Sequence, residues 1–221
     1  MVSRPLLYIG NRNYSSWSLR AWLALRFMEY DFDVERLPLD TPEFYARITS
    51  ISAAGRVPVL KDGDAVIWDS LAICEYAAER AIRGGWPVDE RARTHARCAV
   101  AEMHSGFRAL RGALPMNIRA HRRVALDAAV ERDIARMLVL WCEALTRHGG
   151  GAGWLYGERS IADAFFAPVL LRFVTYEVPV SERCRPWMER VLGDADLAVW
   201  CAEALEETEI VWADEAGESV S

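Results

Sequence analysis

Residues 55–78 read GRVPVLKDGDAVIWDSLAICEYAA, and this stretch decides the fold of the chain. Residues 57–60 and 65–67 are short apolar runs joined by a turn that contains glycine, which predicts a β-hairpin. Asp69 and Ser70 follow at once. Both are favoured helix N-cap residues, and the apolar positions after them have helical spacing. The stretch therefore predicts strand, turn, strand and helix in that order.

The residues before this stretch predict two further strands and two further helices. Residues 6–9 (LLYI) form a short apolar run typical of a buried strand, and Ser15 and Ser16 then open a helix whose apolar spacing continues to Phe27. Residues 33–39 alternate weakly and predict a second strand. Thr41 and Pro42 open a short helix, because proline suits the first helical position. The predicted order is βαβαββα over about 80 residues.

The chain after residue 82 predicts only helices. Gly84–Pro87 interrupts the pattern and indicates a linker, so we expect a first domain at 1–82, a linker at 83–90 and a second, all-helical domain at 91–221. We expect one helix through residues 96–114, a second through 130–145 that ends at Gly149–Gly151, a third from a capping box at Ser160–Asp163, and two shorter ones around Trp187 and Trp200.

Composition excludes several classes of partner. The chain has 221 residues, 52% of them hydrophobic, and a net charge of −6, which is typical of a globular protein and argues against a nucleic-acid or anionic-membrane partner. No apolar run approaches the ~18–20 residues of a membrane span, and no leader segment is recognisable. Nine of the acids and no lysine or arginine lie in residues 191–221, which we interpret as a solvated terminal helix and a frayed end.

The five cysteines indicate free thiols. They are odd in number, no CxxC occurs, and they do not cluster with histidine. We therefore expect neither disulfides nor a metal site, and a reducing, cytoplasmic location.

Three local patterns carry chemistry. Ser15 and Ser16 lie at a helix N-terminus, where unpaired N–H groups and a serine hydroxyl would stabilise a thiolate; the alternative is an ordinary N-cap. Val57 and Pro58 could place a free strand edge beside a peptide ligand if their peptide bond is cis; the alternative is an edge-strand proline. Asp69 could meet a ligand ammonium, or could simply cap its helix.

Four segments together resemble the cytosolic glutathione S-transferase family. They are NYSSWSLRAWLAL at 13–25, GRVPVL at 55–60, WDSLAICEYAAE at 68–79 and ERSIADAFFAPV at 158–169, in the family's order. The resemblance implies an α/β thioredoxin-like N-terminal domain followed by an all-α helical-bundle C-terminal domain. It is strongest for the serine-type classes, theta-like and zeta-like, in a bacterial-looking member. Trp17 departs from the zeta pattern, which usually has cysteine at that place.

The resemblance assigns roles to individual residues. Ser15, with Ser16 as its neighbour and substitute, would be catalytic and would hold the glutathione thiolate. Val57 would pair with the cysteinyl part of glutathione, and Pro58 would be the cis-proline. Asp69 and Ser70 would hold the γ-glutamyl end, and Arg56 would be a polar residue lining the site. Ser160 and Asp163 would be structural.

The resemblance also implies a second pocket, for a small hydrophobic electrophile. We expect its wall to be formed by Tyr14, Trp17, Met103, Phe107, Leu110 and Arg111; the alternative for the apolar members is that they belong to the helix core. We interpret His104 as facing solvent or a neighbouring helix. Family members usually pair as homodimers.

The predicted function is therefore a glutathione transferase, with glutathione as co-substrate, no metal, and conjugation to a small hydrophobic electrophile. Two alternatives stay open. One is a glutathione-dependent cis–trans isomerase of the maleylacetoacetate type, and the other is a non-catalytic binding or regulatory protein with the transferase fold.

Overall fold

The first seven elements occur in the predicted order. In the computed structural model, which describes residues 4–150 and 153–220, they are β1 (Leu6–Ile9), α1 (Ser16–Phe27), β2 (Asp33–Arg36), α2 (Pro42–Ile51), β3 (Val59–Asp62), β4 (Ala65–Trp68) and α3 (Ser70–Ala78). The thioredoxin-like βαβαββα prediction is confirmed.

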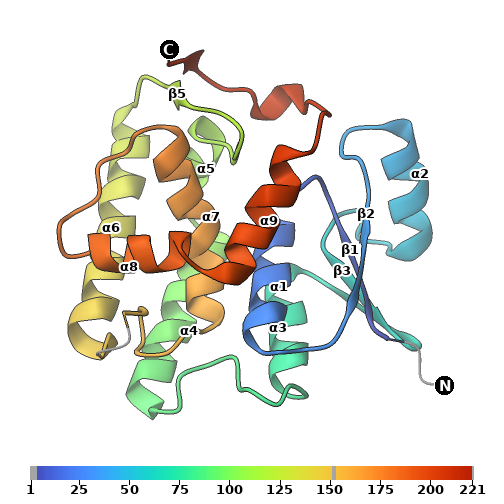
Figure 1. Cartoon of the computed structure of the whole chain (residues 1–221), viewed down its shortest axis with the longest axis horizontal. Helices are drawn as coiled ribbons and strands as arrows, with labels where there is room; N and C mark the ends of the chain where they lie inside the picture. Colours follow the sequence, from blue (N-terminus) through green and yellow to red (C-terminus); the bar gives the residue numbers. More distant parts are fainter. Residues whose placement is uncertain (1–3, 151–152, 221) are drawn as a thin grey trace.

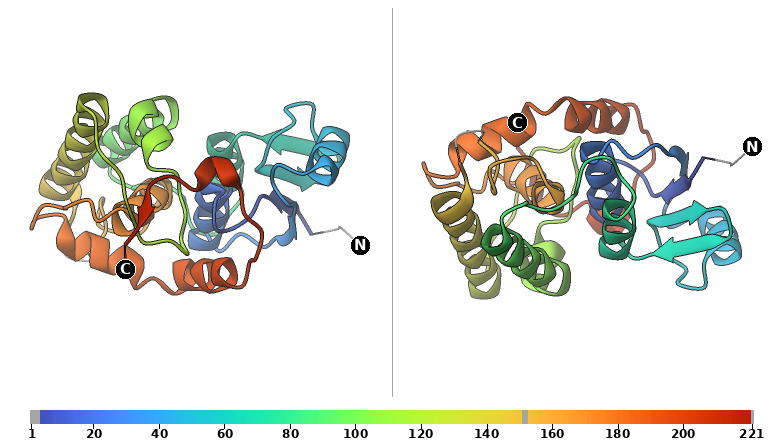
Figure 2. Two further views of the ribbon diagram at one scale, coloured as in Figure 1. Left: turned by 90° about the horizontal axis from the view of Figure 1, so that it is seen from above. Right: turned by 90° about the horizontal axis from the view of Figure 1, so that it is seen from below.

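The four strands form one mixed sheet in the order β2-β1-β3-β4. β1 runs parallel to β2 and antiparallel to β3, and β3 and β4 form the hairpin. Alternate residues of β1 face opposite layers: Leu7 and Ile9 join the core shared with α1 and α3, whereas Tyr8 packs with Phe44 and Ile48 of α2. Figures 1 and 2 show α2 alone on its side of the sheet.

The second half is helical apart from two short strands. Its elements are α4 (Glu90–Ser105), α5 (Arg108–Ala113), β5 (Arg122–Arg123), α6 (Ala128–His148), α7 (Ile161–Thr175), α8 (Arg185–Leu192), α9 (Ala195–Leu205), the 3₁₀ helix η1 (Trp212–Asp214) and β6 (Glu218–Ser219). The helical C-terminal domain is confirmed. The predicted stop at Gly149–Gly151 fits the end of α6, although Gly151 lies outside the described residues.

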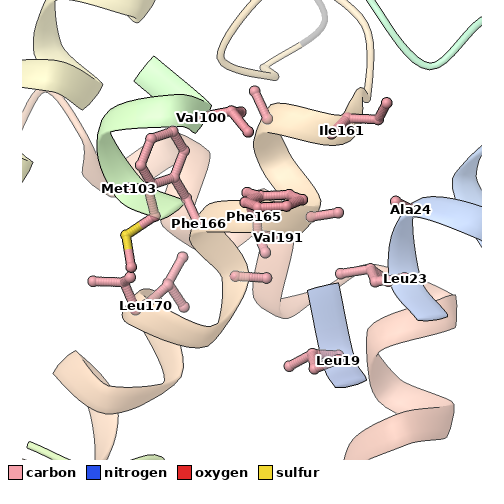
Figure 3. Packing of buried hydrophobic residues seen from close by; sticks show 14 of the residues in the cluster. Leu19, Leu23, Ala24, Val100, Met103, Ile161, Phe165, Phe166, Leu170 and Val191 are labelled. Carbon is pink, nitrogen blue, oxygen red and sulfur yellow. The ribbon is translucent and has the colours of Figure 1, made fainter. Parts of the chain in front are cut away.

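Helix α7 joins the two halves. It begins at the predicted capping box, in which the Ser160 amide donates to Asp163 Oδ2 at 2.9 Å. Its side chains lie between α1, which contributes Leu19 and Leu23, and α4, which contributes Met103 (Figure 3). Because α1 begins beside the predicted site, this packing fixes the position of that helix relative to the second half.

The single helix expected through residues 96–114 is wrong. The chain breaks at Gly106, which is extended, and Phe107, which has a left-handed φ of 56°. Glycine is a poor helix former, and the amide of Leu110 in the first turn of α5 donates to Asp133 Oδ2 of α6 at 3.0 Å. The two helices keep the same apolar spacing, so the periodicity did not reveal the break.

The frayed end expected for the acidic tail is also wrong. We call residues 206–220 the C-terminal segment. Its β6 pairs antiparallel with β5, and its Glu215 carboxylate accepts from the Arg122 guanidinium and from Asn117. Figure 1 shows the segment running from α9 across the top of the molecule toward β5. Complementary charge therefore holds this acidic segment on the protein surface.

No helix within residues 4–150 and 153–220 is long and apolar enough to cross a lipid bilayer.

Candidate active site

A cavity of about 420 Å³ lies where the hairpin, the start of α3, the start of α1 and the α4–α5 region meet. Its wall is formed by Trp17, Ala54, Arg56, Val57, Pro58, Trp68, Asp69, Ser70, His104 and Arg111. A larger groove of about 1260 Å³ lies at the linker, and it contains none of the predicted site residues. The smaller cavity is therefore the one that matches the predicted chemistry.

Val57 and Pro58 line the cavity with backbone that the sheet does not use. The peptide bond between them is cis. The register of β1 with β3 ends at Val59, so the peptide groups of Val57 lie outside the strand pairing. They are available to an extended peptide laid along this edge.

Asp69 is held in place from two sides. It is the N-cap of α3, its carboxylate accepts from the Leu71 amide at 2.8 Å, and its Oδ2 lies 3.1 Å from His104 Nε2 of α4. Its φ of 79° is unusual for a residue with a side chain, and such strain is concentrated at functional sites. Burial alone would raise the pKa of Asp69, but the hydrogen bonds from His104 and from the helix amides outweigh it and lower the pKa.

Ser70 presents an unused hydroxyl at the start of α3. It is 2% exposed, and its Oγ has no hydrogen-bond partner among the described residues. A buried polar atom without a partner costs free energy unless a ligand or water satisfies it. Ser70 therefore points to a ligand group at the N-terminus of α3, where the helix favours an anion.

The two serines at the start of α1 lie beside the cavity rather than in its wall. Ser15 and Ser16 are each 7% exposed. The Ser15 Oγ lies 2.7 Å from the Ser18 Oγ, which accepts from the Gly10 amide. The Ser16 Oγ accepts from Nη2 of the buried Arg172 at 3.1 Å. Trp17 is the residue of this helix start that lines the cavity.

The expected electrophile wall is divided. Arg111 and Trp17 line the cavity, whereas Met103, Phe107 and Leu110 lie in the hydrophobic core. Tyr14 is 4% exposed and lies under the C-terminal segment, where its hydroxyl donates to Glu215 Oε1 at 2.6 Å and accepts from Arg119. Of the six residues expected in this wall, the structure therefore places only Trp17 and Arg111 in the wall of the cavity.

Three arginines surround the start of α1. The guanidinium of Arg20 lies 4.5 Å from the ring centre of Trp17, and that of Arg111 lies 5.2 Å from it. Burial lowers the pKa of Arg20 well below its ordinary value, and the charges of Arg172 and Arg111 act in the same direction. Burial likewise lowers the pKa of Arg172, to about 10. Three cationic side chains therefore lie close to Trp17 and to the start of α1.

The sequence interpretation missed several residues of this region. His104, which we expected to face solvent or another helix, joins α4 to Asp69, and Trp68 and Ala54 line the cavity. A usable signal existed for Arg20 and Arg172, because each is a charged residue with apolar neighbours in the middle or last turn of a helix. Charged residues are almost never fully buried without a reason.

The arrangement suits a small zwitterionic peptide. Asp69 offers a carboxylate for an ammonium group, Ser70 and the start of α3 offer donors for a carboxylate, and Val57 offers a strand edge. The positive start of α1 would stabilise an anion such as a thiolate. Among the described residues there is no group of three or more side chains that could hold a metal ion.

Comparison with known proteins agrees with this geometry. Residues 14–80 match the family profile "Glutathione S-transferase, N-terminal domain". A probable maleylacetoacetate isomerase from Caenorhabditis elegans is 25% identical over 179 residues, which are 80% of this chain and 83% of that protein.

Solved structures share the fold over almost the whole chain. A glutathione transferase homologue from Burkholderia, crystallised with bound glutathione, superposes with a TM-score of 0.71 at 22% identity over 93% of this chain and 100% of that one. A glutathione S-transferase from Xylella fastidiosa superposes with a TM-score of 0.66 at 24% identity over 91% of this chain and 99% of that one.

Proposed function

We propose that the chain is a glutathione S-transferase, which binds glutathione in the cavity beside Trp17 and transfers it to an electrophile. One observation carries this proposal. The strand edge at Val57, the acid of Asp69 and the unpartnered hydroxyl of Ser70 come from separate parts of the sequence and line the same cavity. Each has a different complementary group on a γ-glutamyl peptide.

Glutathione binding follows from matching these groups. Its ammonium faces Asp69, whose lowered pKa keeps the carboxylate ionised near neutral pH. The γ-glutamyl carboxylate lies at Ser70 and the first amides of α3, and the cysteinyl peptide pairs with Val57. Arg56, exposed at the rim of the cavity, takes the glycyl carboxylate.

Thiol activation, of the serine type, belongs to the start of α1. Lowering a thiol pKa from ~8.5 to ~6.5 takes about 2.7 kcal/mol of preference for the anion. One charge-assisted hydrogen bond and a helix N-terminus supply a stabilisation of that size. Ser16 accepts from Arg172, so its own hydroxyl hydrogen is left to donate to sulfur. Ser15 shares its hydrogen with Ser18 and is the second candidate.

The test is the ultraviolet absorbance of the thiolate of bound glutathione, followed as the pH is varied. The wild type should titrate below the pH at which free glutathione titrates. Ser16→Ala and Ser15→Ala should each be compared with it, and the variant whose titration moves toward that of free glutathione identifies the serine that meets the sulfur. A titration unchanged in both variants would remove the serines from this role.

A second candidate function is glutathione-dependent cis–trans isomerisation. It is favoured by the similarity to the probable maleylacetoacetate isomerase. An isomerase regenerates glutathione in each cycle, whereas a transferase consumes one molecule per product, so the stoichiometry of glutathione loss separates the two. Titration calorimetry with glutathione tests the non-catalytic alternative, which is favoured if no binding is detected at millimolar concentration.

We also propose that the protein forms a homodimer in which the first domain of each subunit packs on the second domain of the other. Trp68 of the edge strand β4 is 56% exposed beside the cavity, and this large aromatic side chain supports the proposal because a second subunit would cover it. Light scattering coupled to size-exclusion chromatography measures the mass in solution; a mass of 24.9 kDa would contradict the dimer.

A reducing, cytoplasmic location completes the proposal. The five cysteines are free thiols in the structure, and free thiols persist where glutathione keeps them reduced. Thiol titration of protein purified without reductant should find all five.

A further inference from the structure

The cavity contains more positive charge than glutathione needs. On the proposed function, the ammonium of glutathione is matched by Asp69, and its two carboxylates are matched by Ser70 with the start of α3 and by Arg56. The thiolate is assigned to Ser16 and the start of α1, so Arg111, which also lines the cavity, has no glutathione group assigned to it. It belongs to α5, whereas Val57 directly precedes the strands of the hairpin.

Arg111 is itself without a partner. No hydrogen bond or ion pair joins its side chain to any described residue, and its Nε is buried without a partner. Its guanidinium lies over the face of Trp17, 5.2 Å from the ring centre, and it is attracted by the carboxylate of Asp133, without an ion pair, and repelled by Arg108. A half-buried guanidinium in this state has lost part of its hydration and gained little in return, so an anion placed beside it would be bound strongly.

Arg20 adds a second positive charge next to Trp17, in the interior of the protein. It is 0% exposed, and both of its terminal nitrogens, Nη1 and Nη2, lack hydrogen-bond partners among the described residues. Its guanidinium contacts Trp17 at 4.5 Å, and Arg172 contributes a third charge to the same region. Buried charges are normally paired, so two of them behind one wall of a cavity indicate that the cavity receives negative charge.

We propose that the second substrate carries a carboxylate, and that Arg111 binds this group while the glutathione thiolate attacks the electrophilic carbon. The proposal rests on the proposed function and narrows its substrate class from hydrophobic electrophiles to acidic ones. Trp17 would stack on the apolar part of the substrate, and Arg111, which already lies over the Trp17 ring, would reach a carboxylate at the edge of the same substrate.

A matched pair of probes tests this proposal. In 4-chloro-3-nitrobenzoate the thiolate forms a carbon–sulfur bond at the ring carbon that bears chlorine, chloride leaves with its electron pair, and the carboxylate is unchanged. The neutral 4-chloro-3-nitrobenzamide reacts in the same way and has nearly the same shape. The measured quantity is the ratio of kcat/KM for acid over amide, each divided by its uncatalysed rate with glutathione.

We expect a ratio of about tenfold or more in the wild type, since a charge-assisted hydrogen bond between buried groups has that effect on binding. Arg111→Gln should bring the ratio close to one, and Arg111→Lys should restore part of it. Arg108→Gln is the control, because Arg108 lies on the same helix but is exposed and does not line the cavity. It should keep the wild-type ratio.

Other outcomes would overturn the proposal. A wild-type ratio near one would do so, and so would an Arg111→Gln variant that keeps the ratio but raises the KM for glutathione, which would assign Arg111 to glutathione. If neither probe is turned over, calorimetry with the two finished conjugates decides, and equal affinities for the acid and amide conjugates refute the proposal. Absence of any glutathione binding would instead refute the proposed function.

Discussion

Glu207 offers a sharp test of how the start of α1 is held in place. This residue of the C-terminal segment is 8% exposed, and its carboxylate accepts from the Arg12 amide at 2.8 Å and from the Asn13 amide at 3.1 Å. The two amides belong to the turn that leads into α1. Glu207→Ala removes the acceptor of both amides. Asn13 is 0% exposed, so its amide is then left without a hydrogen-bond partner.

Glu207→Ala should lower the free energy of unfolding by about 2–4 kcal/mol. Hydrogen bonds to a charged acceptor contribute about 1.5–3 kcal/mol each, and water replaces part of what is lost. For a chain of this length that lowers Tm by roughly 5–15 °C. Glu207→Gln should lower the free energy of unfolding by about half as much as Glu207→Ala, because the side-chain amide of glutamine still has one acceptor oxygen. The same variants should weaken glutathione binding, because the turn precedes the helix start at which we propose that the thiolate binds.

Urea unfolding and calorimetric melting measure the cost, with Glu206→Ala as the control. Glu206 is the exposed neighbour, and its replacement should change stability by less than about 0.5 kcal/mol. If Glu207→Ala is as stable as Glu206→Ala, the Glu207 carboxylate does not stabilise the turn, and this prediction is wrong.

Three further predictions concern stability. Gly85→Ala should destabilise the protein by about 1–3 kcal/mol in urea unfolding, because the added Cβ would lie 2.5 Å from Ile161 Cδ1. Gly84→Ala is the control and should not destabilise it, because nothing lies within 4 Å of its added Cβ. Equal effects of the two substitutions would contradict the packing around Gly85. Asp163→Ala should cost about 3–5 kcal/mol, since the amides of Leu155 and Ser160 and the Trp187 Nε1 all lose their acceptor, and Asp163→Asn should cost less. Burial raises the pKa of Asp214 to about 6, so between about pH 4 and 6 the folded state binds a proton that the unfolded state does not. The stability of the wild type relative to Asp214→Asn should therefore fall as the pH rises through this range. A stability difference that does not depend on pH would refute the raised pKa.

The first half of the fold was predictable because its signals are local. Four-residue apolar runs, a proline at the first position of α2 and the Asp69 cap of α3 each act within a few residues of the chain. The break between α4 and α5 was not predictable in this way. It depends on a left-handed Phe107 and on Asp133, which lies 23 residues beyond the amide that it accepts from.

The candidate site shows the same division. Val57, Asp69 and Ser70 could be placed together because they follow from strand and helix ends that meet at one edge of the sheet. Periodicity could not separate a cavity wall from a core, so Met103 and Leu110, expected in the wall, lie in the interior instead. The contribution of His104 depends on a contact with Asp69 across 35 positions of the sequence, which no local pattern encodes.

The anchor at Glu207 has a consequence for biosynthesis. The Arg12 amide and its acceptor are separated by 195 positions, so a ribosome adding roughly 5–20 residues per second needs about 10–40 seconds between making the one and making the other. During that interval the nascent thioredoxin-like half can form its sheet, but the amides of Arg12 and Asn13, in the loop that precedes its first helix, lack the acceptors that Glu207 provides. A chain released before residue 207 would therefore lack two hydrogen bonds that hold the turn at the start of α1, where we propose that the thiolate binds.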